Sequence, residues 1–264
     1  MSQARKALTR LSLVFVTTVS FGQTLLTTIP VPDYPQAMAI NTFTDRVYVL
    51  EESANQVTEI DGSTHAGVAI PLGKNSISSL NGALAINPFT NKIYAVDGVN
   101  NHLSIIDGPT HAVTQINVGN APVALALNPV TNTIYVVNQS DNTVSVIDGT
   151  TLATTTIPVG AGPTGIAVDS TAQRIYVTDT LRDEVFVLDM QGTVLQTIGK
   201  EGQAEGEFNY PTEVRLDGEN LPVDLFGGFQ PTTLMVLKRN PNRFGNRCHA
   251  GIMAICPPGG NRSG

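Results

Sequence analysis

The sequence lacks tryptophan, has only two cysteines and is poor in charged residues, which make up 14% of its 264 residues. Both cysteines, Cys248 and Cys256, lie near the C-terminus, so the rest of the chain must be held together by packing and strand pairing. No long stretch has helical periodicity, and no apolar run is long enough to cross a bilayer as a helix. These absences argue against a disulfide scaffold, a helical bundle and a helical membrane protein.

What the sequence has in abundance is turn residues between short β-forming runs. It contains 24 glycines and 16 prolines, and Val, Ile and Thr recur in runs of a few residues. Such runs, bounded by Gly, Pro, Asn and Asp, are typical of strands. The chain is also long enough to bury one sizeable core. Its composition therefore predicts an all-β domain.

The first 22 residues differ from the rest of the chain. The segment MSQARKALTR has three positive charges and no acid, and the following LSLVFVTTVSFG is uncharged and mostly apolar. This order is typical of a signal peptide, with the small residues Ser20 and Gly22 placed for cleavage before Gln23. The alternative is a buried first strand. We expect residues 1–22 to be a signal peptide and the protein to be extracellular, periplasmic or on the cell surface.

Charge is unevenly distributed along the chain. All 22 acidic residues lie between Asp33 and Asp224, whereas residues 239–264 contain basic residues and no acid. An acidic body repels phosphate backbones, which argues against nucleic acid as a partner. We expect residues 239–264 to be an irregular basic tail, in which the two cysteines can pair locally in an oxidising compartment.

Comparison of the chain with itself reveals a repeat. Four tyrosines, at positions 48, 94, 135 and 176, are spaced by 46, 41 and 41 residues. Three further sets keep the same spacing: Asn41, Asn87, Asn128 and Asp169; Asn55, Asn101, Asn142 and Asp183; and Asp61, Asp107, Asp148 and Asp189. Each unit reads as four short strands, a to d, with turn sequences such as PVTN between a and b and DG between c and d.

A repeat of about 41 residues with four strands per unit predicts a β-propeller blade. A parallel β-helix has a much shorter period, and an immunoglobulin array has about 100 residues per repeat. We expect a propeller over residues 23–238, with blades near residues 35–72, 81–118, 122–159, 163–198 and 211–238.

The fifth unit is degenerate. Pro222 stands where the other units have Tyr, which weakens a strand because Pro cannot donate to a ladder, and the outer strand is missing. Residues 24–31, TLLTTIPV, match strand d of the third unit, TTTIPV. We therefore expect this N-terminal strand to complete the last blade and close a ring of about five blades. An open or truncated propeller, followed by a tail unrelated to the repeat, is an alternative of equal standing.

The stretch NPVTNTIYVVNQSDNTVSVIDGT strongly resembles the repeat of the YVTN family of β-propellers, with YVLE, YAVD, YVVN and YVTD as the corresponding strands. The stretch GKEGQAEGEFNYPTEVRLD resembles instead the start of an NHL repeat. The resemblance covers roughly residues 24–226 and implies a propeller fold. It also implies a secreted or surface-attached protein with a surface-layer or binding role, although more distant propellers include lactonases and lyases.

Polar residues recur where strand b ends. In a propeller the b–c and d–a loops share one face, so these oxygens would form a circle at the channel mouth. Hard cations such as Ca²⁺ prefer oxygen ligands. The candidate metal ligands are Glu51, Asp97, Asn138 and Asp179, with Asp224 less clearly aligned. The alternative, which the repetition in every blade favours, is that each residue caps its turn by bonding to the backbone.

Residues that differ between the copies are better candidates for a binding site. On the same face these are Glu52, Asn100, His102, Asp141, Arg182 and Glu184. His102, near Asp97, has the chemistry of a base or a ligand, although an exposed loop histidine usually has neither role. His65 and His111 lie at equivalent c–d turns on the opposite face, and we interpret both as turn residues.

The sequence contains no assembled catalytic motif. GAGPTG, at residues 160–165, has G-x-G-x-x-G spacing, but a strand rather than a helix follows it. The sequence thus predicts a monomeric, non-enzymatic scaffold that binds a protein or glycan across one face, with first contacts at the enlarged loops 73–83 and 199–212. The alternative is a lactonase-like, metal-dependent hydrolase or lyase with Ca²⁺ or another divalent cation at the channel mouth.

Overall fold

The computed structural model of the chain describes residues 12–16, 25–31, 34–52, 54–73, 83–202, 207–216, 220–224, 235–238 and 253–254. The elements in these ranges are β-strands, and apart from one two-stranded pair they form four-stranded sheets that are the blades of a β-propeller. The predicted all-β propeller is confirmed. No helix in the described ranges is long and apolar enough to cross a membrane. The loop predicted at 73–83 and the basic tail lie almost entirely outside the described residues.

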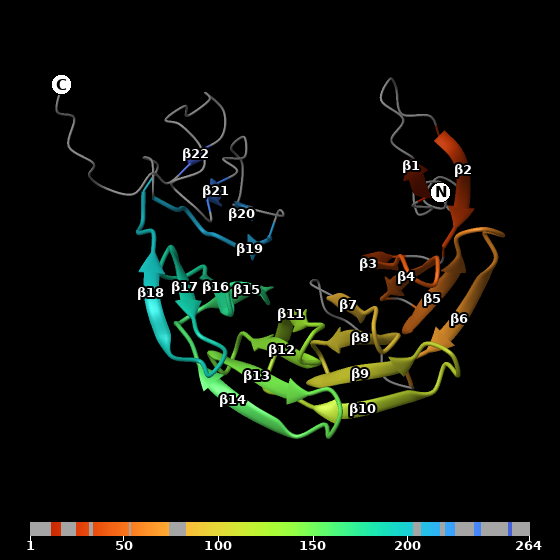
Figure 1. Ribbon diagram of the computed structural model, residues 1–264, viewed down its shortest axis with the longest axis horizontal. Helices are drawn as coiled ribbons and strands as arrows, with labels where there is room; N and C mark the ends of the chain where they lie inside the picture. The colour runs from red at the N-terminus through yellow and green to blue at the C-terminus, as the bar shows by residue number, and fades with distance from the viewer. Residues whose placement is uncertain are drawn as a thin grey trace, which may run out of the picture. The chain divides into compact units, whose positions relative to one another are not determined.

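The chain divides into two compact units, and unit 1 comprises residues 1–123. It contains two blades and a separate pair of strands, β1 (Ser12–Val16) and β2 (Leu25–Pro30). Blade 1 consists of β3 (Pro35–Asn41), β4 (Arg46–Glu51), β5 (Gln56–Asp61) and β6 (Gly67–Pro71). Blade 2 consists of β7 (Leu84–Asn87), β8 (Lys92–Asp97), β9 (His102–Asp107) and β10 (Val113–Asn117), as Figure 1 shows.

Unit 2, residues 124–264, contains the remaining three sheets, apart from the first two residues of β11. Blade 3 consists of β11 (Pro122–Asn128), β12 (Thr133–Asn138), β13 (Thr143–Asp148) and β14 (Thr154–Pro158). Blade 4 consists of β15 (Pro163–Asp169), β16 (Arg174–Asp179), β17 (Glu184–Leu188) and β18 (Val194–Ile198). The last sheet, blade 5, consists of β19 (Glu213–Val214), β20 (Asn220–Asp224), β21 (Met235–Lys238) and β22 (Met253–Ala254).

Blades 1 to 4 follow the predicted four-strand order. In each, strands a to d lie in sequence order across the sheet. The repeated tyrosines keep one register: Tyr48 pairs with Glu59, Tyr94 with Ile105, Tyr135 with Val146 and Tyr176 with Val187. The 41-residue period therefore corresponds to one blade, as predicted.

The strand at residues 24–31 does not have the predicted partner. We expected it to complete the last blade, but β2 pairs antiparallel with β1, and β21 pairs with β20 and, in parallel, with β22. A hairpin partner close in sequence is entropically cheaper to reach than a strand at the far end of the chain. Ile29 and Val31 are buried in one cluster with Val47, Val49 and Ile60 of blade 1, so this segment packs on the first blade.

Backbone geometry explains one of the repeated residue sets. At the b–c turns, Asn55, Asn101, Asn142 and Asp183 have φ values of 48°, 58°, 55° and 55°. Asn and Asp tolerate this left-handed conformation better than other residues with a Cβ, because their short side chains bond to the local backbone. These positions are repeated because each blade makes the same turn.

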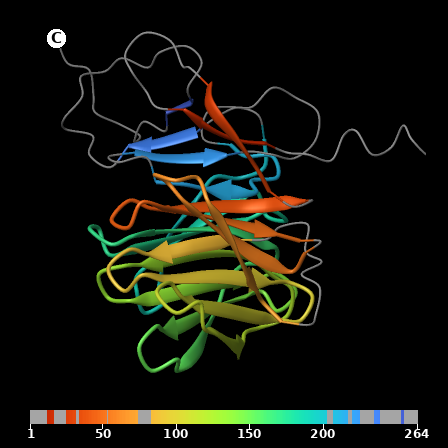
Figure 2. The ribbon, with the colours of Figure 1, turned by 90° about the vertical axis from the view of Figure 1, so that its right-hand side faces the viewer.

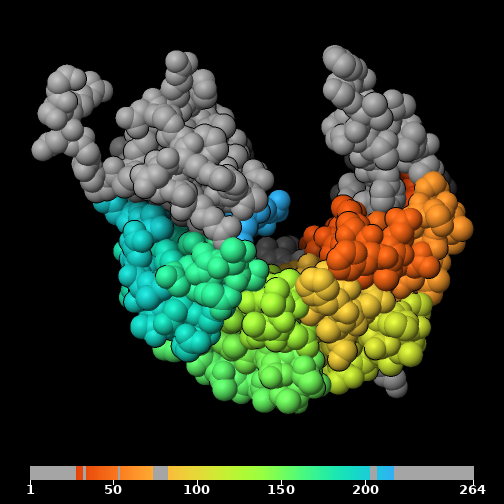
Figure 3. All heavy atoms as spheres, viewed as in Figure 1, coloured from red at the N-terminus to blue at the C-terminus, as the bar shows by residue number. Residues whose placement is uncertain are grey.

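The core of unit 1 lies between its two blades. Tyr48 and Leu50 of blade 1 belong to the same buried cluster as Ile93 and Ile106 of blade 2. Figure 2 shows the two sheets, orange and yellow, packed against each other, and their atoms touch in the space-filling view of Figure 3. Full burial of one such side chain is worth about 1.5–3 kcal/mol. Blade-to-blade packing thus stabilises the unit without any disulfide.

The enlarged loop at 199–212 is anchored to blade 4 through its described residues. Phe208 is fully buried, in one cluster with Tyr176 and Val185. Gly199, at φ 93°, lets the backbone pass so close to the Phe208 ring that a Cβ would lie 2.0 Å from it. This loop thus has a structural task, and the binding role that its length suggested stays a prediction.

Candidate functional site

The four predicted metal ligands lie at equivalent places in four blades. Glu51, Asp97, Asn138 and Asp179 end strands β4, β8, β12 and β16, and their exposed fractions are 0%, 3%, 0% and 0%. Burial of a polar side chain is costly unless it is hydrogen-bonded. The partners of these side chains therefore show what each residue does.

Asp97 and Asp179 cap the turns that follow them. Oδ1 of Asp97 accepts hydrogen bonds from the backbone N–H of Val99 (3.1 Å) and Asn100 (3.0 Å). Oδ1 of Asp179 accepts equivalent bonds from residues 181 and 182, and its Oδ2 accepts one from the N–H of Ala161 at 2.6 Å. The turn-capping interpretation is correct for these two residues.

Asn138 and Glu51 are held by side chains of the next strand instead. Nδ2 of Asn138 donates to Thr143 Oγ1 at 3.0 Å and to Ser145 Oγ at 2.9 Å. Oε2 of Glu51 accepts a hydrogen bond from Gln56 Nε2 at 2.6 Å, while its buried Oε1 has no partner. Burial raises the pKa of Glu51 above its ordinary value, and interactions with neighbouring polar side chains offset part of this rise.

No metal centre emerges in the described part of the chain, where no three His, Cys, Asp or Glu side chains group closely enough to hold an ion. Each of the four predicted ligands belongs to a different blade. A cation at the channel mouth therefore stays a prediction.

The predicted binding residues all lie at the b–c ends of their own blades. Glu52 Oε2 accepts a hydrogen bond from Gln36 Nε2 at 2.7 Å, and Arg182 Nε lies 4.0 Å from Asp179 Oδ2. His102 and Glu184 begin β9 and β17, directly opposite Asp97 and Asp179 in the sheet register, and Asp141 is an exposed turn residue. The structure thus joins Arg182 to Asp179 and pairs His102 with Asp97.

A pocket of unit 1 lies at the opposite ends of the strands, where the a–b and c–d turns are. It has a volume of about 330 Å³ and is formed between blades 1 and 2. Its lining residues are Thr44, Arg46, Tyr48, Glu59, Asn91, Gly108, Pro109 and His111. This volume is at the lower end of the range for small-molecule sites.

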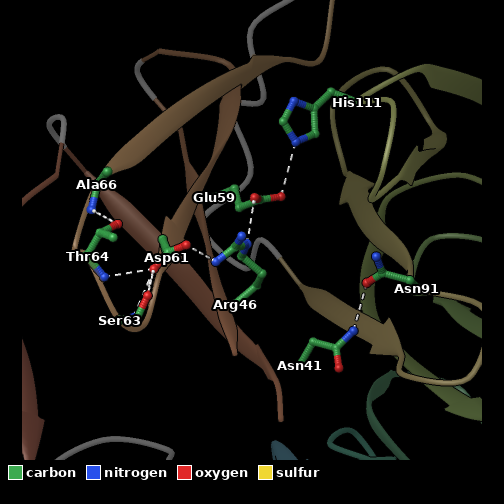
Figure 4. A network of polar contacts seen from close by, with 9 residues as sticks. All are labelled: Asn41, Arg46, Glu59, Asp61, Ser63, Thr64, Ala66, Asn91 and His111. Atoms are coloured by element: carbon green, nitrogen blue, oxygen red, sulfur yellow. Dashed lines mark hydrogen bonds and ion pairs between the residues drawn. The ribbon is translucent and has the colours of Figure 1, made fainter. Parts of the chain in front are cut away.

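A polar network crosses this pocket from blade 1 to blade 2 (Figure 4). Nε of Arg46 lies 3.2 Å from Oε1 of Glu59, and its Nη1 donates to Asp61 Oδ2. Because a carboxylate only accepts, Nε2–H of His111 donates to the other oxygen of Glu59, at 3.1 Å. Glu59 is therefore held from both sides, by a cation of its own blade and an imidazole of the next.

The surroundings fix the protonation of two neighbours. Burial, followed by the adjacent Glu59 carboxylate, raises the pKa of Tyr48 above its ordinary value, so its hydroxyl stays protonated. Hydrogen bonds from Ser63 Oγ (2.6 Å) and the Thr64 N–H (2.8 Å) lower the pKa of Asp61 and keep it ionised beside Arg46. The pocket thus combines a phenol, an imidazole and a paired guanidinium, with no uncompensated cation.

The sequence contains a signal for this pocket, although the binding residues predicted from the sequence all lie on the b–c face. Glu59 stands where the next three blades have Ile105, Val146 and Val187. A charged residue on a strand position that is otherwise apolar is the kind of departure that marks a site. His111 is a turn residue as predicted, with φ 58°, but its ring also makes the contact to Glu59.

Comparison with known proteins supports the fold. No curated protein matches the chain. A family model described as DUF5128, 6-bladed beta-propeller, matches residues 166–227. The structure is similar to an inactive virginiamycin B lyase from Staphylococcus aureus solved with quinupristin, at 14% identity and a TM-score of 0.63, covering 81% of this chain and 80% of that one.

Two further solved structures are similar at the same level. For hydrazine synthase of Kuenenia stuttgartiensis the identity is 15%, the TM-score 0.62, and the coverage 78% of this chain. For a streptogramin B lyase the corresponding values are 11%, 0.62 and 76%. The chain spans 63% of the hydrazine synthase chain and 65% of the streptogramin B lyase chain. Such similarities show the propeller fold alone, so the YVTN and NHL assignment stays a prediction.

Proposed function

We propose that this protein is a secreted or cell-surface propeller of the YVTN type, with an NHL-like last repeat, and that it acts as a non-enzymatic scaffold for a protein or glycan. The observation that carries the proposal is the pocket between blades 1 and 2, in which Glu59 replaces the apolar residue of the other blades. A rigid two-blade scaffold holds its polar groups in place before a ligand arrives, which lowers the entropic cost of binding.

The proposal moves the binding surface away from the predicted b–c face. There, Asp97 and Asp179 use their oxygens to cap turns, and Asn138 uses its amide within its own blade. At the pocket, by contrast, Arg46 and His111 are about one third exposed, with values of 32% and 34%. Partly exposed polar side chains that line a pocket are accessible to a ligand.

The test is binding of the purified full chain to isolated cell envelopes of the producing organism. Glu59→Ile gives blade 1 the residue of blade 2 and removes the acceptor that Arg46 and His111 share. We expect about tenfold weaker envelope binding or more, because a charged hydrogen-bonded group is lost. Glu52→Gln, at the other ends of the strands, is the matched control and should bind as the wild type does.

Thermal melting of both variants separates a binding effect from a folding effect. If Glu59→Ile lowers the melting temperature, Glu59→Gln, which keeps the shape of the side chain, replaces it in the binding measurement. Unchanged envelope binding by a folded Glu59→Ile variant would show that the pocket is not the binding site.

The second candidate is a metal-dependent hydrolase or lyase, favoured by the similarity in fold to virginiamycin B lyase and by the buried carboxyl group of Glu51 with one free oxygen. Ca²⁺ or another divalent ion would then be held by Glu51, Asp97, Asn138 and Asp179. Metal analysis of purified protein tests this directly. A stoichiometric ion that is lost in Asp97→Ala supports the enzyme, whereas unchanged melting in chelator, with no ion bound, eliminates it.

A further inference from the structure

The a–b turns of blades 1 and 2 each expose a phenylalanine. Phe43 is 69% exposed and Phe89 is 65% exposed. Their ring centroids are 5.8 Å apart and the rings are inclined by 40°. Two aromatic rings that touch each other while most of their surface faces water form a small apolar platform, which a folded protein has no structural need to expose.

The same two turns help to build the polar pocket. Thr44 follows Phe43, and Asn91 lies two residues after Phe89, and both line the pocket. Nδ2 of Asn41 donates to Oδ1 of Asn91 at 2.7 Å, which ties one turn to the other (Figure 4). The aromatic platform and the pocket therefore belong to one surface of unit 1, held by a side-chain bond between the blades.

The charges that line the pocket are already paired. Arg46 contacts both Glu59 and Asp61, and His111 donates to Glu59. Arg46 is the lysine- or arginine-type residue among the described lining residues, so the pocket itself offers an anion no unpaired guanidinium or ammonium group, and the acidic body disfavours anions in general. The other polar lining side chains, those of Thr44, Tyr48 and Asn91, can each donate and accept, which suits hydroxyl groups, since each hydroxyl can do both.

We propose that the ligand of this surface is an uncharged glycan, an inference that rests on the proposed binding function. A sugar ring presents polarised C–H groups on one face, which pack on the negative face of an aromatic ring, and hydroxyls around its edge. The C–H face lies on Phe43 and Phe89, and the hydroxyls of the same or the next sugar bond within the pocket, to His111 and Glu59.

A glycan fits better than a protein surface for two reasons. A stable protein interface buries about 800 Å² on each partner around large apolar anchors. Among the exposed large apolar side chains described in unit 1, Phe43 and Phe89 alone lie on its a–b turns. A platform of two rings beside a pocket of about 330 Å³ is small for a protein and large enough for a short saccharide.

The chemical test uses envelopes treated in two ways before the full chain is added. Periodate cleaves vicinal diols of sugars, and protease removes surface proteins. We expect periodate to abolish binding of the chain and protease to leave it intact. The reverse result overturns the glycan inference but supports the proposed scaffold function, with a protein as the partner. If the chain does not bind untreated envelopes, both the glycan inference and the scaffold function are wrong.

The site is tested with Phe43→Ala combined with Phe89→Ala. The matched control is Val130→Ala, because Val130 occupies the equivalent a–b position of blade 3 and is 75% exposed. The probes are cellohexaose and mannohexaose, whose sugars carry the vicinal diols that periodate cleaves, with polygalacturonate as an anionic comparison. We expect at least one uncharged hexasaccharide to bind, the double variant to lose about tenfold or more in affinity, and the control to bind as the wild type does.

Equal hexasaccharide binding by the double variant and the wild type contradicts the placement on these turns. Tighter binding of polygalacturonate than of either neutral hexasaccharide contradicts the chemical class. Absence of any saccharide binding, together with loss of envelope binding in Glu59→Ile, overturns the glycan inference while the scaffold function holds.

Discussion

Blades 1 and 3 are built on the same strand register, yet the third strand of each carries a different kind of residue beside the repeated tyrosine. In blade 1, Tyr48 pairs with Glu59, and in blade 3, Tyr135 pairs with Val146. The valine is apolar and half-buried. The glutamate instead joins Arg46 to His111 and lines a pocket. One backbone position therefore carries an apolar residue in one copy and a polar pocket residue in another, so the repeated residues maintain blades, and the proposed binding function falls on a residue that differs.

The largest expected effect comes from removing a repeated residue. Tyr94 is fully buried in blade 2, so Tyr94→Ala leaves a cavity and lowers the free energy of unfolding by about 3 kcal/mol or more. Urea unfolding followed by circular dichroism measures this loss. Val99→Ala, at a side chain that is 52% exposed, is the control and should change stability little. If Tyr94→Ala lowers the free energy of unfolding by less than about 1 kcal/mol, the repeated positions do not contribute more to stability than the variable ones.

A middle-sized effect is expected at a repeated turn. Asn142 has φ 55°, which a β-branched side chain adopts only with strain, so Asn142→Val should destabilise the protein by about 1–2 kcal/mol. Asn142→Gly, which has no Cβ, is the matched variant and should cost less. The same urea titration compares them, and equal losses for Val and Gly would mean that backbone conformation is not the reason for the repeat.

The smallest effect is expected from the repeated aspartates of the c–d turns. Backbone N–H groups of Thr151 and Thr150 lower the pKa of Asp148 below its ordinary value. A lowered pKa means that the stabilisation is complete above the pKa of the unfolded chain, about 4, and is lost as the pH falls through the lower pKa of the folded state. Melting temperatures between about pH 6 and pH 2 should therefore fall slightly less steeply in Asp148→Asn than in the wild type. The same dependence of melting temperature on pH in both proteins would show that the Asp148 carboxylate does not stabilise this turn.

Much of the fold was predictable because its causes are local. Strand alternation, the Asp-Gly turns and the spacing of the tyrosines predicted a four-stranded blade at residues 122–159, and β11 to β14 span residues 122–158. The partner of residues 24–31 was not predictable, because the last blade and the apolar leader both offered a compatible strand. Which of two compatible strands pairs with β2 depends on chain proximity and packing, and the sequence of β2 determines neither of them.

The site was less predictable than the fold. The prediction that function lies where copies differ named only loop residues at the b–c turns, on the face that usually holds a propeller site, whereas the proposed site lies at the other ends of the strands. Glu59 lies within strand β5, and its meaning depends on Arg46 in β4 and on His111, which comes from the next blade. Glu59 and His111 are 52 positions apart in the sequence, so inspection of neighbouring residues does not reveal this pairing. Phe43 and Phe89 were overlooked because an isolated apolar turn residue is common, and only their contact makes them unusual.

The central claim is that Glu59, which replaces the apolar residue of blades 2 to 4, serves the binding of a ligand in the pocket of blades 1 and 2. The most direct measurement is the affinity of Glu59→Ile for cell envelopes, set beside that of the wild-type chain, with thermal melting of both. The account predicts binding weaker by about tenfold or more at a melting temperature that is unchanged or higher, since isoleucine restores the apolar residue of blade 2. Full envelope binding by a stably folded Glu59→Ile variant would contradict it.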